Sequence, residues 1–246
     1  MKKILLVLLA ISNLAVQAQT ASVDSKKNVW PSFLTKEQMP DGSMYLPAPP
    51  AFDSQEFVAD IVRYHWGKSL RDTPRGKQAH DEAELNVGAM LKVFSTPMGV
   101  TLNKAELPEL TSLLGRVIND AATSTRKAKR HFNRLRPFLY FGEGTLIPEE
   151  EDSHHTPSYP SSHSAAGWTV ALVLTELCPE RAEQILKAGY EYGQSRVIAG
   201  YHYQSDVDAA RMAASACIAR LHADDAFQQQ MAKAKKELLT SAMRHP

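Results

Sequence analysis

Apolar residues recur at intervals of three and four along most of this chain, and that period limits the fold more than any other feature of the sequence. The clearest run places its apolar positions on one face of an α-helix: Leu110, Leu113, Leu114, Val117, Ile118 and Ala121. No segment shows the period-2 alternation that is typical of a half-buried strand, and no internal repeat is present. We therefore expect an all-α fold, a helical bundle in a single domain, for which the length is sufficient.

The same pattern predicts where the helices lie. Three helices are expected to begin near residues 53–54, 74 and 108. Four more are expected at about 162–177, 180–195, 202–223 and from 225 onward. The first carries Phe57, Ile61 and Val62 on its apolar face, and the second continues through Phe94. The third runs to about residue 135, because a residue before proline is excluded from the helical region and Arg136 precedes Pro137. A loop of about 25 residues follows, and loops of this length are usually functional or disordered.

The N-terminal segment is typical of an exported protein. Residues 1–18 contain two lysines, an apolar run and small residues at the end, as a secretory signal peptide does, and this run is too short to span a membrane. Residues 19–52 are rich in proline and turn-forming residues and are expected to form an extended arm. Residues 53–246 are then expected to form the helical domain that carries the candidate site. We expect the exported protein in the periplasm, and secretion beyond the periplasm stays open.

Charge and cysteine content exclude some classes of protein. The formal net charge is +1 at pH 7, which gives no electrostatic reason to expect nucleic acid or an anionic membrane as a partner. Cys178 and Cys217 are the only two cysteines, so they cannot form a disulfide framework, although a single bridge between them stays open.

Three short segments carry residues suited to phosphate chemistry. Lys129 lies seven residues before Arg136, which is about two turns on one helix, so both cations are expected on the same face. Arg196 ends a later helix. Arginine forks and a lysine point charge together match the oxygens of a phosphoryl group.

The segment "TPSYPSSHSAAGW" opens the helix expected at residue 162. Ser161 and Ser162 lie at its start, where backbone N–H groups and the helix dipole favour an anion, and His163 follows them. His202 and Asp206 lie four residues apart at the start of another helix, so the carboxylate can hold the imidazole ring and fix its tautomer.

The order and spacing of these residues along the chain resemble the signature of a known family. Lys129-x6-Arg136-Pro137, then Pro160-Ser161-Ser162-His163, then Ser195-Arg196-x5-His202-x3-Asp206 is similar to the signature of the phosphatidic acid phosphatase type 2 and vanadium haloperoxidase superfamily. Outside this signature, "YLPAPP", "RGKQAHDEA", "RPFLYFG" and "GYEYGQSRVIAGYHYQSDVDAAR" resemble the bacterial class A non-specific acid phosphatases. The resemblance extends over nearly the whole chain after residue 18.

This resemblance implies a fold, an activity and a set of roles. The fold would be the helical bundle of the acid phosphatase and haloperoxidase type, and the activity would be phosphomonoester hydrolysis through a phosphohistidine, with phosphotransfer as a side reaction. His202 would be the nucleophile, Asp206 its orienting group and His163 the general acid, protonated in the resting enzyme, which predicts an acid pH optimum. No cofactor or metal is expected, the substrate is a small-molecule phosphomonoester, and a homo-oligomer is implied.

One position departs from the family pattern. Ser162 stands where the family usually has glycine, and Ser164 stands where it has threonine after the histidine. We expect Ser162 at ordinary helix-start angles, where it keeps its N–H donor. A set of cations is expected on the phosphate: Lys129, Arg136 and Arg196, with Ser161 and Ser162 beside them.

Other functions remain open. The same residues could hold vanadate in a vanadium-dependent haloperoxidase, or bind phosphate without catalysis. A lipid phosphatase is less compatible, because its relatives usually carry several membrane-spanning helices. His154 and His155 with the acidic run before them could bind a metal, but no ligand geometry favours this. Tyr140, Phe141 and Tyr159 could stack on a substrate or belong to the core.

Overall fold

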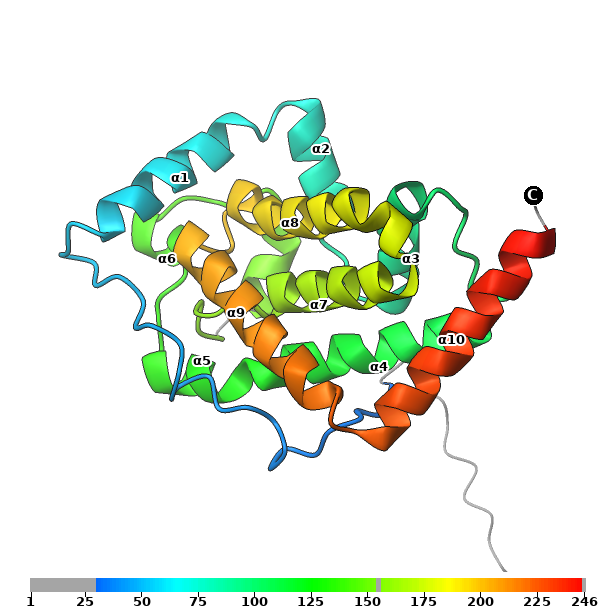
Figure 1. Cartoon of the computed structure of the whole chain (residues 1–246). Helices are drawn as coiled ribbons and strands as arrows, with labels where there is room; N and C mark the ends of the chain where they lie inside the picture. Colours follow the sequence, from blue (N-terminus) through cyan, green and yellow to red (C-terminus); the bar gives the residue numbers. More distant parts are fainter. Residues whose placement is uncertain (1–29, 154–155, 245–246) are drawn as a thin grey trace, which may run out of the picture.

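The computed structural model describes residues 30–153 and 156–244, and this part of the chain contains helices and no strand. Four helices form its centre: α4 (Pro108–Ser124), α7 (Ser162–Leu177), α8 (Ala182–Ala199) and α9 (Gln204–Leu221). Helix α7 lies between α8 and α4, with α9 crossing the group (Figure 1). The expected all-α fold is therefore confirmed.

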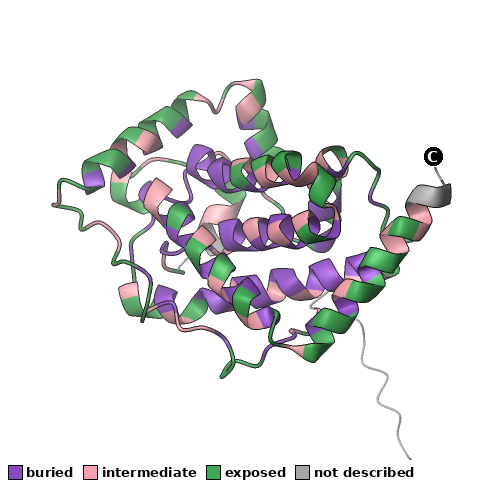
Figure 2. Cartoon of the chain, viewed as in Figure 1, coloured by how far each residue is buried: buried purple, intermediate pink, exposed green. Residues whose placement is uncertain are grey.

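The remaining helices cover this centre. They are α1 (Phe57–Ser69), α2 (Pro74–Asp81), α3 (Val87–Met98), α5 (Arg126–Phe132), α6 (Pro137–Phe141) and α10 (Asp225–Arg244), with two short 3-10 helices, η1 (Pro148–Ser153) and η2 (Pro179–Arg181). Burial is concentrated in α7, α8 and α4, whereas α1 and α10 expose much of their surface (Figure 2). None of the helices in this described part of the chain is long and apolar enough to cross a membrane.

Helix α7 is central because its residues are small or apolar on every side. It buries residues all round, from His163 and Ala166 to Leu174 and Leu177, and a helix without a polar face is stable only when enclosed. Its contact with α8 is close, since a Cβ added at Gly167 would meet the Tyr192 ring at 2.2 Å. The main apolar cluster joins α7 with α3, α4 and α10.

Helix α1 is turned differently from the sequence-based expectation. Phe57 is buried as predicted, but Val62 is 60% exposed, and the buried positions continue through Asp60 and Tyr64. The expectation was wrong because the period of apolar residues cannot show that a polar residue, Asp60, finds a partner inside the protein.

Two other predicted helices are each divided in two. The segment after Pro74 breaks between α2 and α3, where the Asn86 side chain accepts the N–H of Ala89 at 2.9 Å and starts a new helix. The segment predicted to run to residue 135 breaks between α4 and α5, and α5 ends at Asn133, whose φ of 44° is left-handed. Lys129 and Arg136 consequently lie on different elements and do not share a helix face.

The four helices predicted after residue 160 are confirmed as α7, α8, α9 and α10. The segment between 136 and 160 contains α6 and η1, so it is not the structureless loop that was expected. Cys178 and Cys217 are both free thiols. The predicted signal peptide and the first part of the predicted arm, residues 1–29, lie outside the described residues.

Residues 30–52, which precede α1, lie along the helical domain and form no regular helix. The Asp120 carboxylate on α4 accepts the N–H groups of Phe33 and Leu34 at 2.9 and 3.2 Å. The carbonyl of Pro47 accepts the hydroxyl of Tyr159 at 2.6 Å, just before α7. This segment is thereby attached both to the core and to the chain that leads into α7.

Candidate active site

The site forms where α8 ends, α9 begins and α7 begins. Gly200 caps α8 with a φ of 87°, which reverses the chain so that the His202 N–H donates to the Arg196 carbonyl at 3.3 Å. The N–H of Ser161, at the start of α7, donates to the Asp206 carbonyl at 3.1 Å. These backbone contacts bring the segment that begins α7, with Ser161 to His163, next to the segment that carries Arg196, His202 and Asp206.

His202 and Asp206 form a buried pair. Nδ1 of His202 lies 3.3 Å from Oδ2 of Asp206, and the two residues are 3% and 0% exposed. The predicted contact is thus present, although His202 precedes the helix and Asp206 lies in the first turn of α9. The same Oδ2 accepts the Tyr203 N–H at 2.9 Å and the Ser158 hydroxyl.

The neighbours of His202 select one tautomer. Asp206 only accepts, so it takes a hydrogen from Nδ1, while the Arg136 guanidinium only donates and lies 3.3 Å from Nε2. Both contacts are satisfied by a neutral ring with its hydrogen on Nδ1. The lone pair of Nε2 is then directed at the guanidinium side of the site, where a phosphoryl group would be attracted.

Arg136 is almost fully enclosed and is held by backbone. Its Nε donates to the Thr156 carbonyl at 2.9 Å, and its guanidinium also donates to the Tyr201 carbonyl at 3.0 Å and the Thr156 hydroxyl at 3.0 Å. Burial lowers its pKa to about 10, and the nearby Arg196 acts in the same direction. Arg136 thus remains a cation at neutral pH.

Lys129 lies next to it although it comes from α5. Nζ donates to the carbonyls of Pro157 and Ser158 at 2.6 and 3.3 Å. Burial, and then the charge of Arg136, lower the pKa of Lys129 to about 7. A lysine that titrates near neutrality is sensitive to any anion beside it.

Arg196 completes the set of cations. One of its terminal nitrogens lies 3.3 Å from a carboxylate oxygen of Glu150, and its guanidinium lies 4.4 Å from the centre of the Tyr201 ring. Its Nε and other terminal nitrogen are buried and have no hydrogen-bond partner among the described residues. Buried donors are normally paired, so these two atoms point to an acceptor that binds here.

His163 is the second histidine of the site. Its ring stacks on Tyr192 with centres 4.5 Å apart, and its Nε2 has no partner in the described part of the chain. Burial lowers the pKa of His163 well below its usual value, and the charges of Arg196 and His202 add to this effect. This environment disfavours the imidazolium form, so the protonated resting state expected from the sequence would need a bound anion to offset the Arg196 charge.

The two serines at the start of α7 differ in their contacts. Ser161 caps the helix by accepting the Ser164 N–H at 3.2 Å. Ser162 lies 2.6 Å, oxygen to oxygen, from Thr125, whose own hydroxyl donates to the Ala122 carbonyl. Ser162 has a negative φ, because Asn133 alone of the described non-glycine residues has a positive one. The expectation of ordinary helix-start angles is confirmed, and this serine binds the α4–α5 junction with its hydroxyl.

Several neighbours of the site could not be recognised from the sequence. Arg134 and Asp60 form a buried ion pair behind Asp206, Ser158 donates to that carboxylate, and Glu150 pairs with Arg196. Arg134 lies two residues before Arg136 in "RLRP", and this proximity is the only signal that could have drawn attention to it.

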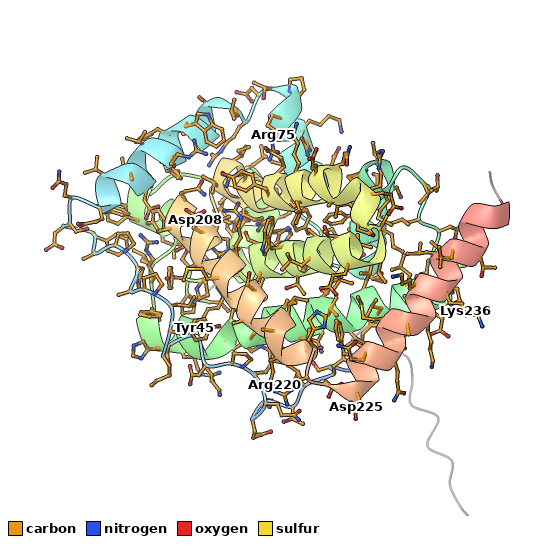
Figure 3. The ribbon with its side chains drawn as sticks, in the orientation of Figure 1. Tyr45, Arg75, Asp208, Arg220, Asp225 and Lys236 are labelled. Atoms are coloured by element: carbon orange, nitrogen blue, oxygen red, sulfur yellow. The ribbon has the colours of Figure 1, made fainter. Side chains whose placement is uncertain are left out.

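A further group supports the end of α8. Arg75 extends from α2 toward α8 (Figure 3), where it donates to the Ser195 hydroxyl at 2.9 Å and to the Glu191 carbonyl at 2.8 Å. Ser195 in turn donates to the buried Glu82 carboxylate. Ser195 is therefore tied to other protein groups, and it holds the helix end that carries Arg196.

Three aromatic residues between 138 and 160 pack against other aromatic rings, although Tyr140 is 39% exposed. Phe141 stacks on Tyr64 with ring centres 4.2 Å apart, and Tyr140 stacks on Phe52 at 4.7 Å. Tyr159 is buried against Phe132. Of the two interpretations that the sequence left open, the structure supports the packing role.

The described residues offer no group of three or more His, Cys, Asp or Glu side chains that could hold a metal ion. The alternative metal site involved His154 and His155, which lie outside the described residues. The arrangement at the junction is cationic instead: three basic side chains, two histidines and a helix start surround one point, and such a set attracts a tetrahedral oxyanion.

Comparisons with known proteins agree with this chemistry. The model of the PAP2 superfamily matches residues 109–228, which include all eight predicted site residues. The non-specific acid phosphatase of Providencia stuartii is 45% identical over 207 residues, covering 83% of this chain and 84% of that one. The non-specific acid phosphatase of Salmonella typhimurium is 38% identical over 220 residues, covering 89% of this chain and 88% of that one.

A solved structure shares the fold at much lower identity. A bacterial vanadium-dependent iodoperoxidase superposes with a TM-score of 0.50 and 17% identity, covering 73% of this chain and 54% of that one. This likeness shows the fold alone. The much higher identity to acid phosphatases, over more than four fifths of the chain, decides the family. The chain belongs to the non-specific acid phosphatases of the PAP2 superfamily and is a phosphomonoester hydrolase.

Proposed function

We propose that this enzyme hydrolyses phosphomonoesters without a metal, through a phosphohistidine formed on Nε2 of His202. The observation that carries the proposal is the contact of one neutral histidine with Asp206 on Nδ1 and with a buried guanidinium at Nε2. A carboxylate on Nδ1 makes the opposite nitrogen more nucleophilic and stabilises the positive charge that develops on attack.

The three cations are proposed to hold the phosphoryl oxygens. Burial and then the charge of Arg136 lower the pKa of Lys129, and burial and then the charge of Arg196 lower that of Arg136, so the three charges act on one another across different elements. The unpaired donors of Arg196 would bind an oxygen directly, and the N–H groups at the start of α7 with the Ser161 hydroxyl would bind another. Positioning and charge supply most of the acceleration in phosphoryl transfer, so a metal is not required.

The proton for the leaving group is proposed to pass through His163. Burial and the charge of Arg196 disfavour the protonated ring, so we propose that His163 gains its proton when the substrate binds. The negative phosphoryl group offsets the charge of Arg196, and a phosphomonoester carries its own proton below about pH 6. Activity should therefore be greatest on the acid side, where the substrate supplies the proton that His163 then gives to the leaving alkoxide.

Trapping the intermediate tests the mechanism. Mature enzyme is mixed with radiolabelled p-nitrophenyl phosphate in EDTA, quenched in alkali, which preserves phosphohistidine, and analysed by mass spectrometry. We expect label on His202 in the wild type and none in His202→Ala. Turnover that stops in EDTA, or label on another residue, contradicts the proposal.

Leaving groups separate the two histidines. His163→Ala should form the intermediate from p-nitrophenyl phosphate, whose leaving group needs no proton, and should lose on the order of 10²- to 10⁴-fold in rate on an alkyl phosphate. An equal loss on both substrates would remove the general-acid role. Peroxide and bromide with vanadate-loaded enzyme, run alongside, would reveal haloperoxidase activity.

Export and assembly are proposed on the sequence and the family. The first 18 residues would be cleaved as a signal peptide, leaving a periplasmic enzyme, and the protein would form a homo-oligomer. N-terminal sequencing of the protein from a periplasmic extract and its mass by light scattering test these two points. A full-length N-terminus or a monomer would contradict them.

A further inference from the structure

Arg134 is a buried cation that does not belong to the phosphate-binding set. It follows Asn133, whose left-handed backbone ends α5 and turns the chain inward. One terminal nitrogen of Arg134 donates to Oδ1 of Asp206 at 2.7 Å, and the other donates to Oδ2 of Asp60 at 2.8 Å. One guanidinium therefore joins two carboxylates, from α9 and α1.

Ser205 closes this cluster. Its N–H donates to Oδ1 of Asp60 at 2.9 Å, its hydroxyl donates to Oδ2 of Asp60 at 2.5 Å, and it accepts from Arg134 at 2.7 Å. The guanidinium also lies 4.1 Å from the centre of the Tyr203 ring. The planar fork of arginine is thus fixed on both ends and on one face, which a lysine could not reproduce.

The two oxygens of Asp206 have separate tasks in this arrangement. Oδ1 accepts from Arg134, whereas Oδ2 accepts from Ser158 and the Tyr203 N–H and faces Nδ1 of His202. A carboxylate free to rotate could present either oxygen, or neither, to the ring. The Arg134 contact sets the plane of the carboxylate and leaves Oδ2 toward the histidine.

We propose that Arg134, held by Asp60, is a positioning residue for phosphoryl transfer: it orients the Asp206 carboxylate and adjusts the charge that His202 experiences. This inference rests on the proposed function of His202. Among the described residues, the guanidinium of Arg134 bonds to Asp206, Asp60 and Ser205 and lies over Tyr203, so its effect on the reaction passes through Asp206.

The sign of the charge effect follows from the groups around His202. The charged and titratable groups that face His202 or its partners come from several elements of the described chain: Asp206 of α9, Arg136 before α6, Arg196 of α8 with its partner Glu150 of η1, His163 of α7, Lys129 of α5, and behind Asp206 the pair Arg134 and Asp60. Loss of the Asp60 charge leaves Arg134 less neutralised, so the imidazolium form of His202 becomes less stable. Loss of the Arg134 charge has the opposite effect.

The acid limb of the kcat/KM profile measures this protonation in the free enzyme. Asp60→Asn should move the limb to lower pH, and Arg134→Met should move it to higher pH, each by roughly one unit. Arg134→Lys keeps the charge but loses the fork, so kcat should fall on the order of 10- to 100-fold with little movement of the limb, as loss of a carboxylate's or histidine's orienting partner does. Inhibition by inorganic phosphate should hardly change in any of the three.

Asp120→Asn is the matched control. Asp120 is a fully buried carboxylate that accepts two backbone N–H groups far along α4, outside the site. This variant should lose stability without moving the limb. NMR titration of labelled histidine, with the His202 signal assigned by His202→Ala, gives the same shifts without turnover. If Arg134→Met fails to fold, Asp60→Asn and Arg134→Lys keep the test open.

Three results would overturn the inference: no shift in Asp60→Asn, shifts of the same direction in Asp60→Asn and Arg134→Met, or an equal shift in Asp120→Asn. The proposed function fails in a different way. If the wild type forms no phosphohistidine on His202, the function is wrong; if it forms one and the limb does not move, the positioning role alone is wrong.

Discussion

The region where α4, α7 and α10 pack together and the junction where α7, α8 and α9 meet bury side chains of opposite kinds. The first buries leucines, valines and a phenylalanine, among them Leu110, Leu114 and Phe227. The junction buries lysine, arginine, histidine and aspartate at comparable exposure. Both regions share α7, whose residues change from polar to apolar within its first turn.

This difference indicates that the apolar region supplies most of the free energy of folding, whereas the junction buries charges at a free-energy cost. Removal of apolar surface from water favours folding by roughly 25 cal/mol for each Å². Burial of charges costs free energy unless each has a partner, and paired charges often recover little more than this cost. The apolar region should therefore tolerate exchange of one apolar side chain for another of similar volume. At the junction, a substitution that keeps the volume but removes a charge or a hydrogen bond should impair function.

Replacement of His202 should have the largest effect. His202→Ala removes the proposed nucleophile and should lower kcat on the order of 10⁴-fold or more, as loss of a nucleophile does in other covalent mechanisms. Asp206 keeps its contacts with Arg134, Ser158 and the Tyr203 N–H, so the fold should be preserved. Kinetics with p-nitrophenyl phosphate and urea unfolding measure the two effects. A large loss of stability would make the histidine a structural residue.

Replacement of Leu114 should lower stability and leave turnover unchanged, which is the opposite of the effect expected for His202→Ala. This leucine is fully buried on α4, and Leu114→Ala should lower the free energy of unfolding by about 2–5 kcal/mol through lost burial and a cavity. Below the unfolding transition kcat should stay near the wild-type value. Urea titration and kinetics on the same sample test this. If kcat fell with unchanged stability, the two regions would not be separable.

Gly167 belongs to both regions. A Cβ at this position would lie 2.2 Å from the Tyr192 ring, on which His163 stacks. Gly167→Ala should destabilise the protein by about 1–3 kcal/mol, as overpacking does, and should also impair turnover of alkyl phosphates by moving His163. Ala171→Gly on the next turn is a milder control for α7. An unchanged leaving-group dependence would show that the Tyr192 contact does not position His163.

The titration of Lys129 should have a smaller, graded effect. Its pKa is lowered from 10.5 to about 7, so between about pH 7 and 10.5 the unfolded chain binds the proton that the folded one has lost. Stability from this group therefore rises with pH across that window and is lowest below it. Binding of an anion, which needs the charged form, should weaken as pH rises above about 7.

Sulfate isolates this effect, because it remains a dianion over the whole range. The rise in Tm caused by sulfate should be largest between pH 5 and 6, roughly one unit or more below the Lys129 pKa, and should fade above about pH 7. Lys129→Met should show a smaller rise with less dependence on pH. A rise in Tm that persists unchanged to pH 9 would show that Lys129 does not bind the anion.

The sequence allowed the helical class and the long helices after residue 160 to be predicted, since their apolar periods are regular and end at clear signals. It also allowed eight candidate site residues to be named from three spaced motifs and a family resemblance, and their roles stay predictions. The helix breaks at Thr125 and Asn133 escaped prediction because helix-forming residues lie on both sides of them. Val62 was placed wrongly because Asp60, two residues earlier, is the inward residue.

The ion pair of Asp60 with Arg134 joins residues 74 positions apart, and no local sequence pattern predicts such a pair. The same holds for Glu150 with Arg196 and for Ser158 with Asp206, which meet only because separate helices end at one place. The lowered pKa of His163 likewise could not be predicted from the sequence, since it results from burial against Tyr192 and from the nearby Arg196 charge.

By itself, then, the sequence determined the helical period, the turn residues and the identity of the groups that can act on a phosphate, because these depend on neighbours along the chain. Tertiary structure alone decided which face of α1 is buried, how Asp206 is oriented and in which direction the pKa of His163 is shifted. These properties depend on desolvation and on charges brought together across the fold, and both quantities exist only once distant segments have packed.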